Sequence, residues 1–185
     1  MKSITFAVLA LLVSGALMAQ ARKINIKEST ITWTGKKVTG EHSGTLKFQE
    51  GMLIFKGKKV VGGSFIADMT TFSNTDQSGD DKKKLEGHLR SADFFNTDEY
   101  KTAKLVFKSI GEKSPGLYSI TADLTIKGKT NPVKLELAVK GNKASTGFTV
   151  DRTQYGIQYG SGTFFSDLGD RTIYDEFDVK VQLRF

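Results

Sequence analysis

Cysteine is absent from the 185 residues of this sequence. The chain can therefore form no disulfide, and its fold must rest on a packed core, for which a chain of this length is large enough. The same absence excludes a cysteine nucleophile and a lipid-modified N-terminal cysteine. We therefore expect a free protein that is not anchored through a lipidated cysteine.

Catalytic and metal-binding motifs are also lacking. The sequence has no Gly-x-Ser-x-Gly elbow and no glycine-rich phosphate loop, and its two histidines, His42 and His88, do not have metal-ligand spacing. His42 could serve as a base or a metal ligand, but a histidine hydrogen-bonded at the start of a strand is the simpler interpretation. We predict no enzyme activity, no metal and no cofactor.

One segment partly matches a calcium-binding loop. Asn74, Asp76, Ser78 and Gly79 stand at positions one, three, five and six of the template. Position twelve is Leu85, where the template requires a bidentate glutamate. We therefore interpret the segment as a polar loop that caps the next helix.

Long hydrophobic runs are absent beyond a short one at the N-terminus. Lys2 precedes an apolar stretch over Ile4–Val13, and Ala19-Gln20-Ala21 forms a small-x-small cleavage site. A membrane-spanning helix would need about 20 apolar residues. We therefore expect residues 1–21 to be a signal peptide cleaved near Ala21, and the mature protein to be periplasmic or secreted.

The composition is 38% hydrophobic and 25% charged, which is typical of one globular domain, here 22–185. The net charge of +7 is compatible with transient contact with an anionic membrane surface or with a lysine-rich solubilising surface. Nucleic-acid binding is not expected, because the aromatic residues fall on the apolar faces of strands. The oligomeric state is left open.

Apolar and polar residues alternate along most of the chain from Ile31 onward. The clearest examples are 118–126 and 133–139, and a turn is expected at Glu50-Gly51. About eight short strands in hairpin order favour an antiparallel sheet that closes into a barrel. The interior of such a barrel is either filled by side chains or holds one small ligand.

Only the stretch 80–107 has helical spacing. Leu85 and Leu89 fall on one face of a short helix, and Ser78 with Asp81 has the spacing of a capping box. We therefore predict an all-β fold, an antiparallel eight-stranded barrel with one short helical insertion. The insertion is a candidate lid or side wall, although simple core packing would also explain its apolar residues.

An outer-membrane β-barrel is a rival interpretation. The chain ends in a strand with Phe185 as its last residue, and a membrane barrel shows the same alternation turned inside out. Its strands need about 9 to 11 residues, whereas several segments here have only two or three apolar positions. A helical insertion is also atypical of that class.

Four motifs together resemble the YceI-like family: Gly40-x-His42-x-Gly44, His88–Phe95, Leu124–Gly128 and Asp151–Ile157. The resemblance covers essentially all of 22–185. It implies a lipocalin-like barrel, exported to the periplasm, whose apolar cavity binds polyisoprenoid-type lipids such as isoprenoid quinones or prenyl phosphates without catalysis. Many relatives have Tyr-Pro where this chain has Tyr100-Lys101.

The expected function is to hold such a lipid, or another long-chain lipid, for transport, storage or sequestration. The alternative is a barrel with a filled interior that acts through its surface in stress response or adhesion. Possible headgroup partners are His42 and Arg152, although a structural salt bridge would also explain Arg152. The residues expected to line the apolar cavity are Trp33, Phe48, Phe55, Phe65, Leu85, Leu89, Phe94, Phe95, Phe107, Tyr118, Ile120, Leu124 and Phe148.

Overall fold

The computed structural model describes residues 18–185 of the chain. The predicted signal peptide falls mostly on residues 1–17, which lie outside the described residues, so its cleavage stays a prediction. Within 18–185, no helix is long and apolar enough to cross a membrane.

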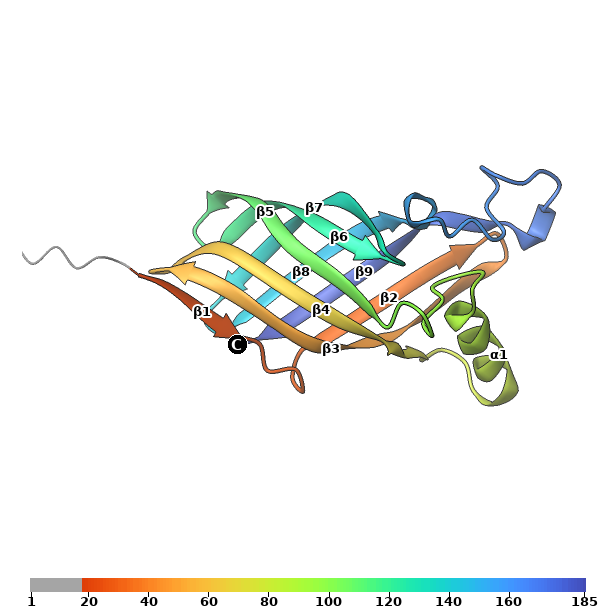
Figure 1. The fold of residues 1–185 in the computed structure, drawn as a ribbon, viewed down its shortest axis with the longest axis horizontal. Helices are drawn as coiled ribbons and strands as arrows, with labels where there is room; N and C mark the ends of the chain where they lie inside the picture. The colour runs from red at the N-terminus through yellow and green to blue at the C-terminus, as the bar shows by residue number, and fades with distance from the viewer. Residues whose placement is uncertain (1–17) are drawn as a thin grey trace, which may run out of the picture.

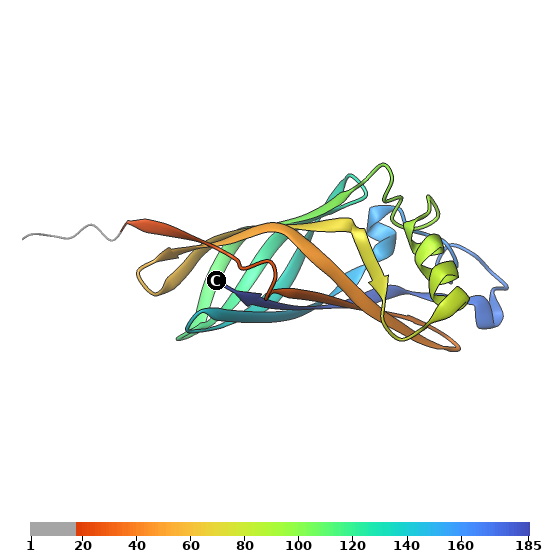
Figure 2. The same ribbon diagram turned by 90° about the horizontal axis from the view of Figure 1, so that it is seen from below.

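Strands β2 to β9 form a closed antiparallel barrel (Figures 1 and 2). Consecutive strands pair with each other, and β9 pairs with β2 to close the sheet. The predicted eight-stranded antiparallel barrel is confirmed. The strands are β2 (Thr30–Lys37), β3 (Gly40–Lys56), β4 (Lys59–Asn74), β5 (Thr102–Ser114), β6 (Leu117–Ile126), β7 (Lys129–Lys140), β8 (Lys143–Asp151) and β9 (Ile173–Arg184).

An additional strand, β1 (Ala19–Lys23), pairs with the second half of β3, from Ala19 opposite Lys56 to Lys23 opposite Met52. Sequence reasoning did not predict this strand because it straddles the expected cleavage site near Ala21. Cleavage there would leave only Arg22 and Lys23 to pair with β3.

The alternation of side chains decides which face of the sheet is buried. In β6, Tyr118, Ile120, Ala122, Leu124 and Ile126 are buried, and the residues between them are more exposed. Successive side chains of a strand point to opposite faces, so the apolar face of the barrel is its interior. This arrangement is the one expected for a barrel that contacts water on its outside.

The turn expected at Glu50-Gly51 is wrong, because β3 continues through these residues with a β-bulge between Phe48 and Glu50. A Cβ atom at Gly51 would lie 2.6 Å from Cδ1 of Phe65 and 2.9 Å from Cδ1 of Ile24. The glycine therefore permits a close approach of side chains rather than a reversal of the chain.

The predicted helical insertion is confirmed as α1 (Gly79–Arg90), which lies across one end of the barrel (Figure 2). The capping box predicted there is wrong, because the Ser78 side chain makes no capping hydrogen bond. Turns over residues 91–101 follow before β5 begins. Two short 3-10 helices, η1 (Arg152–Tyr155) and η2 (Gly169–Arg171), lie in the connection between β8 and β9 at the same end (Figure 1).

The opposite end of the barrel is filled by side chains. Leu53, Phe55, Val60 and Tyr118 are almost completely buried there. The Tyr118 hydroxyl accepts a hydrogen bond from the backbone N–H of Val60 at 3.2 Å, and the rings of Phe55 and Phe185 are 5.4 Å apart. This packing closes one end of the barrel and leaves the α1 end as the place for an opening.

Candidate functional site

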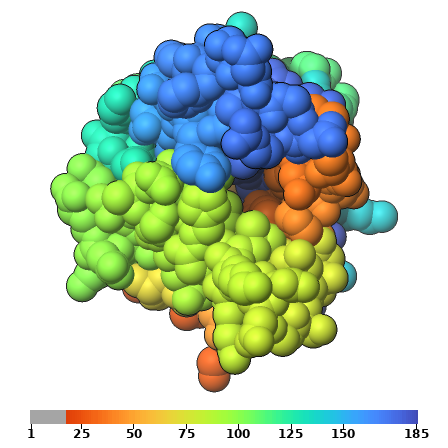
Figure 3. Space-filling view, turned by 90° about the vertical axis from the view of Figure 1, so that its right-hand side faces the viewer, coloured from red at the N-terminus to blue at the C-terminus, as the bar shows by residue number. Residues whose placement is uncertain are grey.

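The barrel contains an apolar cavity of about 480 Å³. Its wall runs from Leu137 and Leu183 in the interior to the exposed residues Lys37 and Arg171. Figure 3, which looks onto this end, shows a hollow between the α1 segment, the β8–β9 connection and the β2–β3 hairpin. This opening is called the mouth below. The volume lies within the range typical of ligand-binding pockets.

Ten of the thirteen residues predicted to line the cavity lie on its wall. Eight come from strands or from the turn after α1, and two, Leu85 and Leu89, come from α1 itself. The ten residues are Trp33, Phe48, Phe65, Leu85, Leu89, Phe94, Phe95, Phe107, Leu124 and Phe148.

The other three predicted residues, Phe55, Tyr118 and Ile120, do not lie on the cavity wall. All three point inward, as their parity requires, but they belong to the packing that fills the closed end. Their placement on the wall is therefore corrected. The period of two identifies the inward face of a strand but carries no information about the position of a residue along the barrel axis.

Sequence reasoning missed a large part of the wall. β9 was expected as a strand, but its inward residues were not assigned to the cavity, and Tyr159 lies in a connection without periodicity. The alternation that identified β9 would have found Phe177, Val179 and Val181. The missed apolar residues include Leu46, Met69, Phe72, Leu105, Ile126, Val150, Tyr159, Ile173, Phe177, Val179 and Val181.

The α1 segment closes the side of the cavity with little burial of its own. No residue within Gly79–Arg90 is fully buried, although Leu85, His88 and Leu89 line the cavity. The His88 ring meets the Phe94 ring edge-on at 4.9 Å and the Tyr159 ring at 4.5 Å. These aromatic contacts join the α1 segment to the β8–β9 connection across the mouth.

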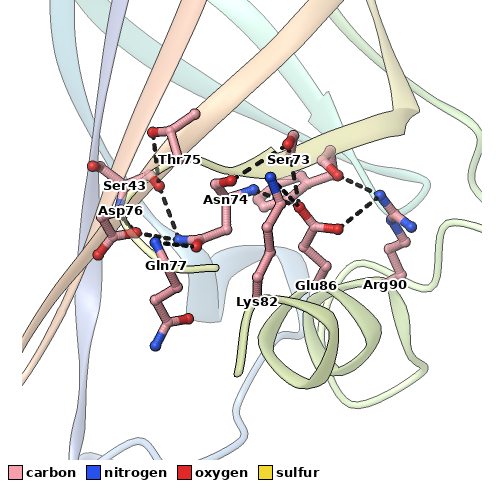
Figure 4. A network of polar contacts seen from close by, with 10 residues as sticks. Ser43, Ser73, Asn74, Thr75, Asp76, Gln77, Lys82, Glu86 and Arg90 are labelled. Carbon is pink, nitrogen blue, oxygen red and sulfur yellow. Dashed lines mark hydrogen bonds and ion pairs between the residues drawn. The ribbon is translucent and has the colours of Figure 1, made fainter. Parts of the chain in front are cut away.

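Polar contacts attach α1 to the end of β4 (Figure 4). The Glu86 carboxylate accepts hydrogen bonds from the Asn74 backbone N–H at 2.8 Å and from the Ser73 hydroxyl at 3.2 Å. Arg90 donates to the carbonyl of Phe72. Burial raises the pKa of Glu86, but the bonds from Asn74 and Ser73 and the nearby charges of Lys82 and Arg90 outweigh it, so this pKa lies below its ordinary value.

The same network continues to the start of β3. The Asn74 side chain is fully buried and donates to the carbonyl of Ser43 at 3.0 Å and to the Asp76 carboxylate. Nδ1 of His42 lies 2.9 Å from Oδ2 of Asp76. Burial raises the pKa of Asp76, but the contacts from His42, Asn74 and Ser43 together hold it below its ordinary value.

This network explains two sequence features. His42 is hydrogen-bonded near the start of a strand, as in its simpler interpretation. Of the residues that matched the calcium template, Asn74 and Asp76 bond to Ser43 at the start of β3. Residues 18–185 contain no cluster of three or more His, Cys, Asp or Glu side chains that could hold a metal ion. The motif Gly40-x-His42-x-Gly44 has a packing reason as well, because a Cβ atom at Gly44 would lie 1.9 Å from the carbonyl oxygen of Ser73.

Arg152 lines the cavity, but its guanidinium is engaged with the backbone. Nε donates to the carbonyl of Tyr174 at 3.0 Å, Nη1 to that of Ile157 at 2.8 Å and Nη2 to that of Ile173 at 3.0 Å. Oδ1 of Asp175 lies 3.5 Å from Nη2. Burial lowers the pKa of Arg152, and the two neighbouring aspartates, Asp175 and Asp151, oppose this shift. These bonds fix the β8–β9 connection onto the barrel.

Charged groups of both signs surround the mouth. Lys36, Lys37, Arg171, Asp170 and Glu176 line the cavity, and Nζ of Lys36 is 3.1 Å from Oδ2 of Asp178. The mouth can therefore solvate a polar group without a strong preference for one sign of charge. Deeper in, the wall is almost entirely apolar.

A closed antiparallel barrel with an apolar cavity open at one end is a lipocalin-like architecture. The YceI-like domain model matches residues 23–185, and the chain belongs to this family.

Curated relatives match about half of the chain. Protein YceI of Escherichia coli O17:K52:H18 is 36% identical over 99 residues, which are 53% of this chain and 49% of that protein. A UPF0312 protein of Shewanella denitrificans is 34% identical over 92 residues, 50% of this chain and 46% of the relative. The matches thus span about half the length of these relatives.

Solved structures share the fold. Burkholderia cenocepacia BcnA superimposes with a TM-score of 0.68 at 21% identity, over 86% of this chain and 98% of that one. A polyisoprenoid-binding domain from Saccharophagus degradans gives 0.58 at 15% identity, over 87% and 95%. At these identities the comparison establishes the architecture.

Proposed function

We propose that this protein is exported to the periplasm and holds a polyisoprenoid-type lipid in its barrel cavity, for transport, storage or sequestration. The observation that carries the proposal is the open apolar cavity of about 480 Å³, walled by aromatic and aliphatic side chains. Membership of the YceI-like family and the fold shared with a polyisoprenoid-binding domain support it. Apart from Trp33 Nε1 and Thr146 Oγ1, which are buried on the wall without a hydrogen-bond partner, the inner wall is apolar and suits a hydrocarbon chain. The proposed role involves no catalysis.

The binding energy would come from the hydrocarbon chain. Burial of each CH2 group contributes about 0.8 kcal/mol, so a five-carbon isoprene unit contributes about 4 kcal/mol before ordering costs. A few units are therefore enough for tight binding without a specific polar contact. The ligand's identity is then selected by its length and by the headgroup at the mouth.

We place the headgroup at the mouth, where His42 lines the cavity beside Lys37 and Arg171. Arg152 is a weaker candidate because its Nε, Nη1 and Nη2 atoms already donate to backbone carbonyls. The mixed charges at the mouth suit either a neutral quinone or a phosphate with its counterions.

A matched pair of alanines tests whether binding occurs inside the barrel. Ala103 lines the cavity on β5, whereas Ala138 is exposed on the outside of β7. We expect Ala103→Trp to fill part of the cavity and weaken binding of a fluorescent isoprenoid analogue at least tenfold, and Ala138→Trp to leave binding unchanged. Circular dichroism checks that both variants fold. Equal binding by folded Ala103→Trp would contradict a site in the cavity.

A further inference from the structure

Exposed apolar side chains gather at the mouth of the cavity. Val38, Tyr159, Phe164, Phe165 and Tyr174 are each between 46% and 51% exposed. They come from the tip of the β2–β3 hairpin, the β8–β9 connection and the start of β9, and they are called the mouth patch below. Contiguous exposed apolar surface of this kind typically marks a site of contact with a partner or a membrane.

The elements that carry the mouth patch are held together by backbone bonds. Val38 N–H donates to the carbonyl of Thr172 at 3.1 Å, and Ile173 N–H donates to that of Gly160 at 2.8 Å. The N–H groups of Phe164 and Phe165 both donate to the carbonyl of Ser161, at 3.2 and 3.0 Å. The two phenylalanines are therefore displayed on an ordered turn, in the connection that extends beyond the strands in Figure 1.

The mouth patch is continuous with the cavity wall. Tyr159 and Tyr174 are half exposed and also line the cavity, and the Tyr159 ring contacts His88 of α1. An apolar surface that leads into an apolar cavity gives a hydrocarbon chain a path that avoids water. A protein partner needs no such continuity, whereas a lipid that leaves a bilayer does.

Charge distinguishes the two ends of the barrel. Close to the mouth patch, Lys36, Lys37 and Arg171 are balanced by Glu41, Asp167 and Asp170. The turns at the closed end are mostly basic and carry Lys56, Lys58, Lys59, Lys113, Lys140 and Lys143, of which Lys59 and Lys113 are paired with Glu112 and Glu136. An anionic surface would therefore attract the closed end, whereas a contact by the mouth depends on apolar and aromatic insertion. Aromatic side chains favour the headgroup level of a bilayer.

We propose that the mouth patch docks on the headgroup region of a lipid bilayer, so that the cavity opens toward the membrane. Phe164 and Phe165 insert as the main apolar contacts, and Tyr159 and Tyr174 lie between the bilayer and the cavity. The proposal extends the proposed function, but docking does not require that the cavity holds a lipid. Vesicle binding and lipid retention can therefore fail independently of each other.

Vesicle flotation tests the docking surface. The full-length mature protein is mixed with phosphatidylcholine vesicles, or with vesicles that also contain phosphatidylglycerol, at low and high salt. We expect binding to both that changes little with salt, and a loss of at least tenfold for the double variant Phe164→Ser/Phe165→Ser. Ile26→Ser/Val61→Ser is the matched control, because Ile26 and Val61 are 46% and 47% exposed but lie away from the mouth, and it should bind like the unmodified protein.

Four results would overturn the proposal. Binding only to anionic vesicles, lost at high salt, would assign docking to the basic closed end. Equal binding by both double variants, or no binding by the unmodified protein, would leave the mouth patch without a membrane role. Sedimentation equilibrium provides the last check. If the unmodified protein is a dimer and Phe164→Ser/Phe165→Ser is a monomer, the mouth patch binds a second copy of the chain rather than a bilayer. Retention of bound lipid by this variant, measured in parallel, reports on the proposed function separately.

Discussion

The attachment of α1 to the barrel leads to a quantitative prediction for Glu86→Ala. The substitution removes the acceptor of the Asn74 N–H and of the Ser73 hydroxyl, at 2.8 and 3.2 Å. Hydrogen bonds to a charged group contribute about 1.5 to 3 kcal/mol each. The two bonds share one carboxylate at a part-buried site, and coupled contributions do not add in full, so we expect a net loss of about 2 to 3 kcal/mol. This corresponds to an equilibrium constant for the opening of α1 that is about 30 to 150 times larger.

Hydrogen exchange measures this opening directly. In Glu86→Ala the amides of α1 and of Asn74 should exchange roughly 30 to 150 times faster, whereas the amides of β6 and β7, which lie far from Glu86, should not change. A bound fluorescent lipid should leave the cavity faster as well, because Leu85 and Leu89 form part of its wall. Glu86→Gln keeps one acceptor oxygen and should give an intermediate effect.

Lys83→Ala is the control, because Nζ of Lys83 reaches only the exposed Asp80 carboxylate, at 3.4 Å. It should leave exchange in α1 within a factor of about two. Unchanged exchange in Glu86→Ala would refute the view that this carboxylate holds the helix. An equal acceleration in β6 and β7 would show that α1 opens only when the whole barrel unfolds.

Four further predictions concern other contacts at the α1 end of the barrel and the pH dependence of Glu86 and Asp76. Gly44→Ala should lower the free energy of unfolding in a denaturant titration by about 1 to 3 kcal/mol or more, because the new Cβ atom would lie 1.9 Å from the Ser73 carbonyl oxygen. Gly35→Ala should leave this free energy unchanged, because its Cβ atom would meet no described atom within 4 Å. Arg152→Met should cost about 3 kcal/mol or more in the same titration, because three carbonyls lose their donor. The contacts of Glu86 and Asp76 depend on pH: with both pKa values below their ordinary values of 4.5 and 3.8, these contacts stabilise the fold fully above about pH 4.5 and are lost as the pH falls through the lowered values. Melting temperatures of Glu86→Gln and the unmodified protein should therefore converge on acidification, and a constant difference would contradict this. Leu89→Asp/Phe94→Asp should give the circular dichroism spectrum of a folded protein but retain no lipid after purification. A folded variant that keeps its lipid would show that these two residues only pack the fold.

The barrel itself could be predicted because its strands alternate with a period of two and are joined by short turns. β6 illustrates this, since every second residue from Tyr118 to Ile126 is buried. The alternation does not show where along the barrel axis a residue lies. Phe55 and Tyr118 were therefore predicted on the cavity wall, whereas they pack the closed end. The turn predicted at Glu50-Gly51 is wrong for another reason. In the sequence, a glycine that permits close packing next to a bulge looks the same as one that permits a turn.

The contacts at the mouth were less predictable because they join residues far apart in the sequence. Ser43 of β3 bonds to Asn74 at the end of β4 and to Asp76 in the loop that follows. The Asn74 backbone in turn bonds to Glu86 of α1. From the sequence alone, Asn74 and Asp76 suggested a calcium template and Ser78 a helix cap. The exposed residues Phe164 and Phe165 lie in a connection without periodicity, and only the fold places them beside the cavity.

Extraction of the purified protein with organic solvent, followed by mass spectrometry, tests the central claim most directly. The protein is isolated from its native export compartment without detergent, and Leu89→Asp/Phe94→Asp is processed in parallel. We predict one class of long-chain isoprenoid lipid at close to one molecule per chain, and its loss from the variant. A cavity that is consistently empty, or a lipid recovered equally from both proteins, would contradict the account.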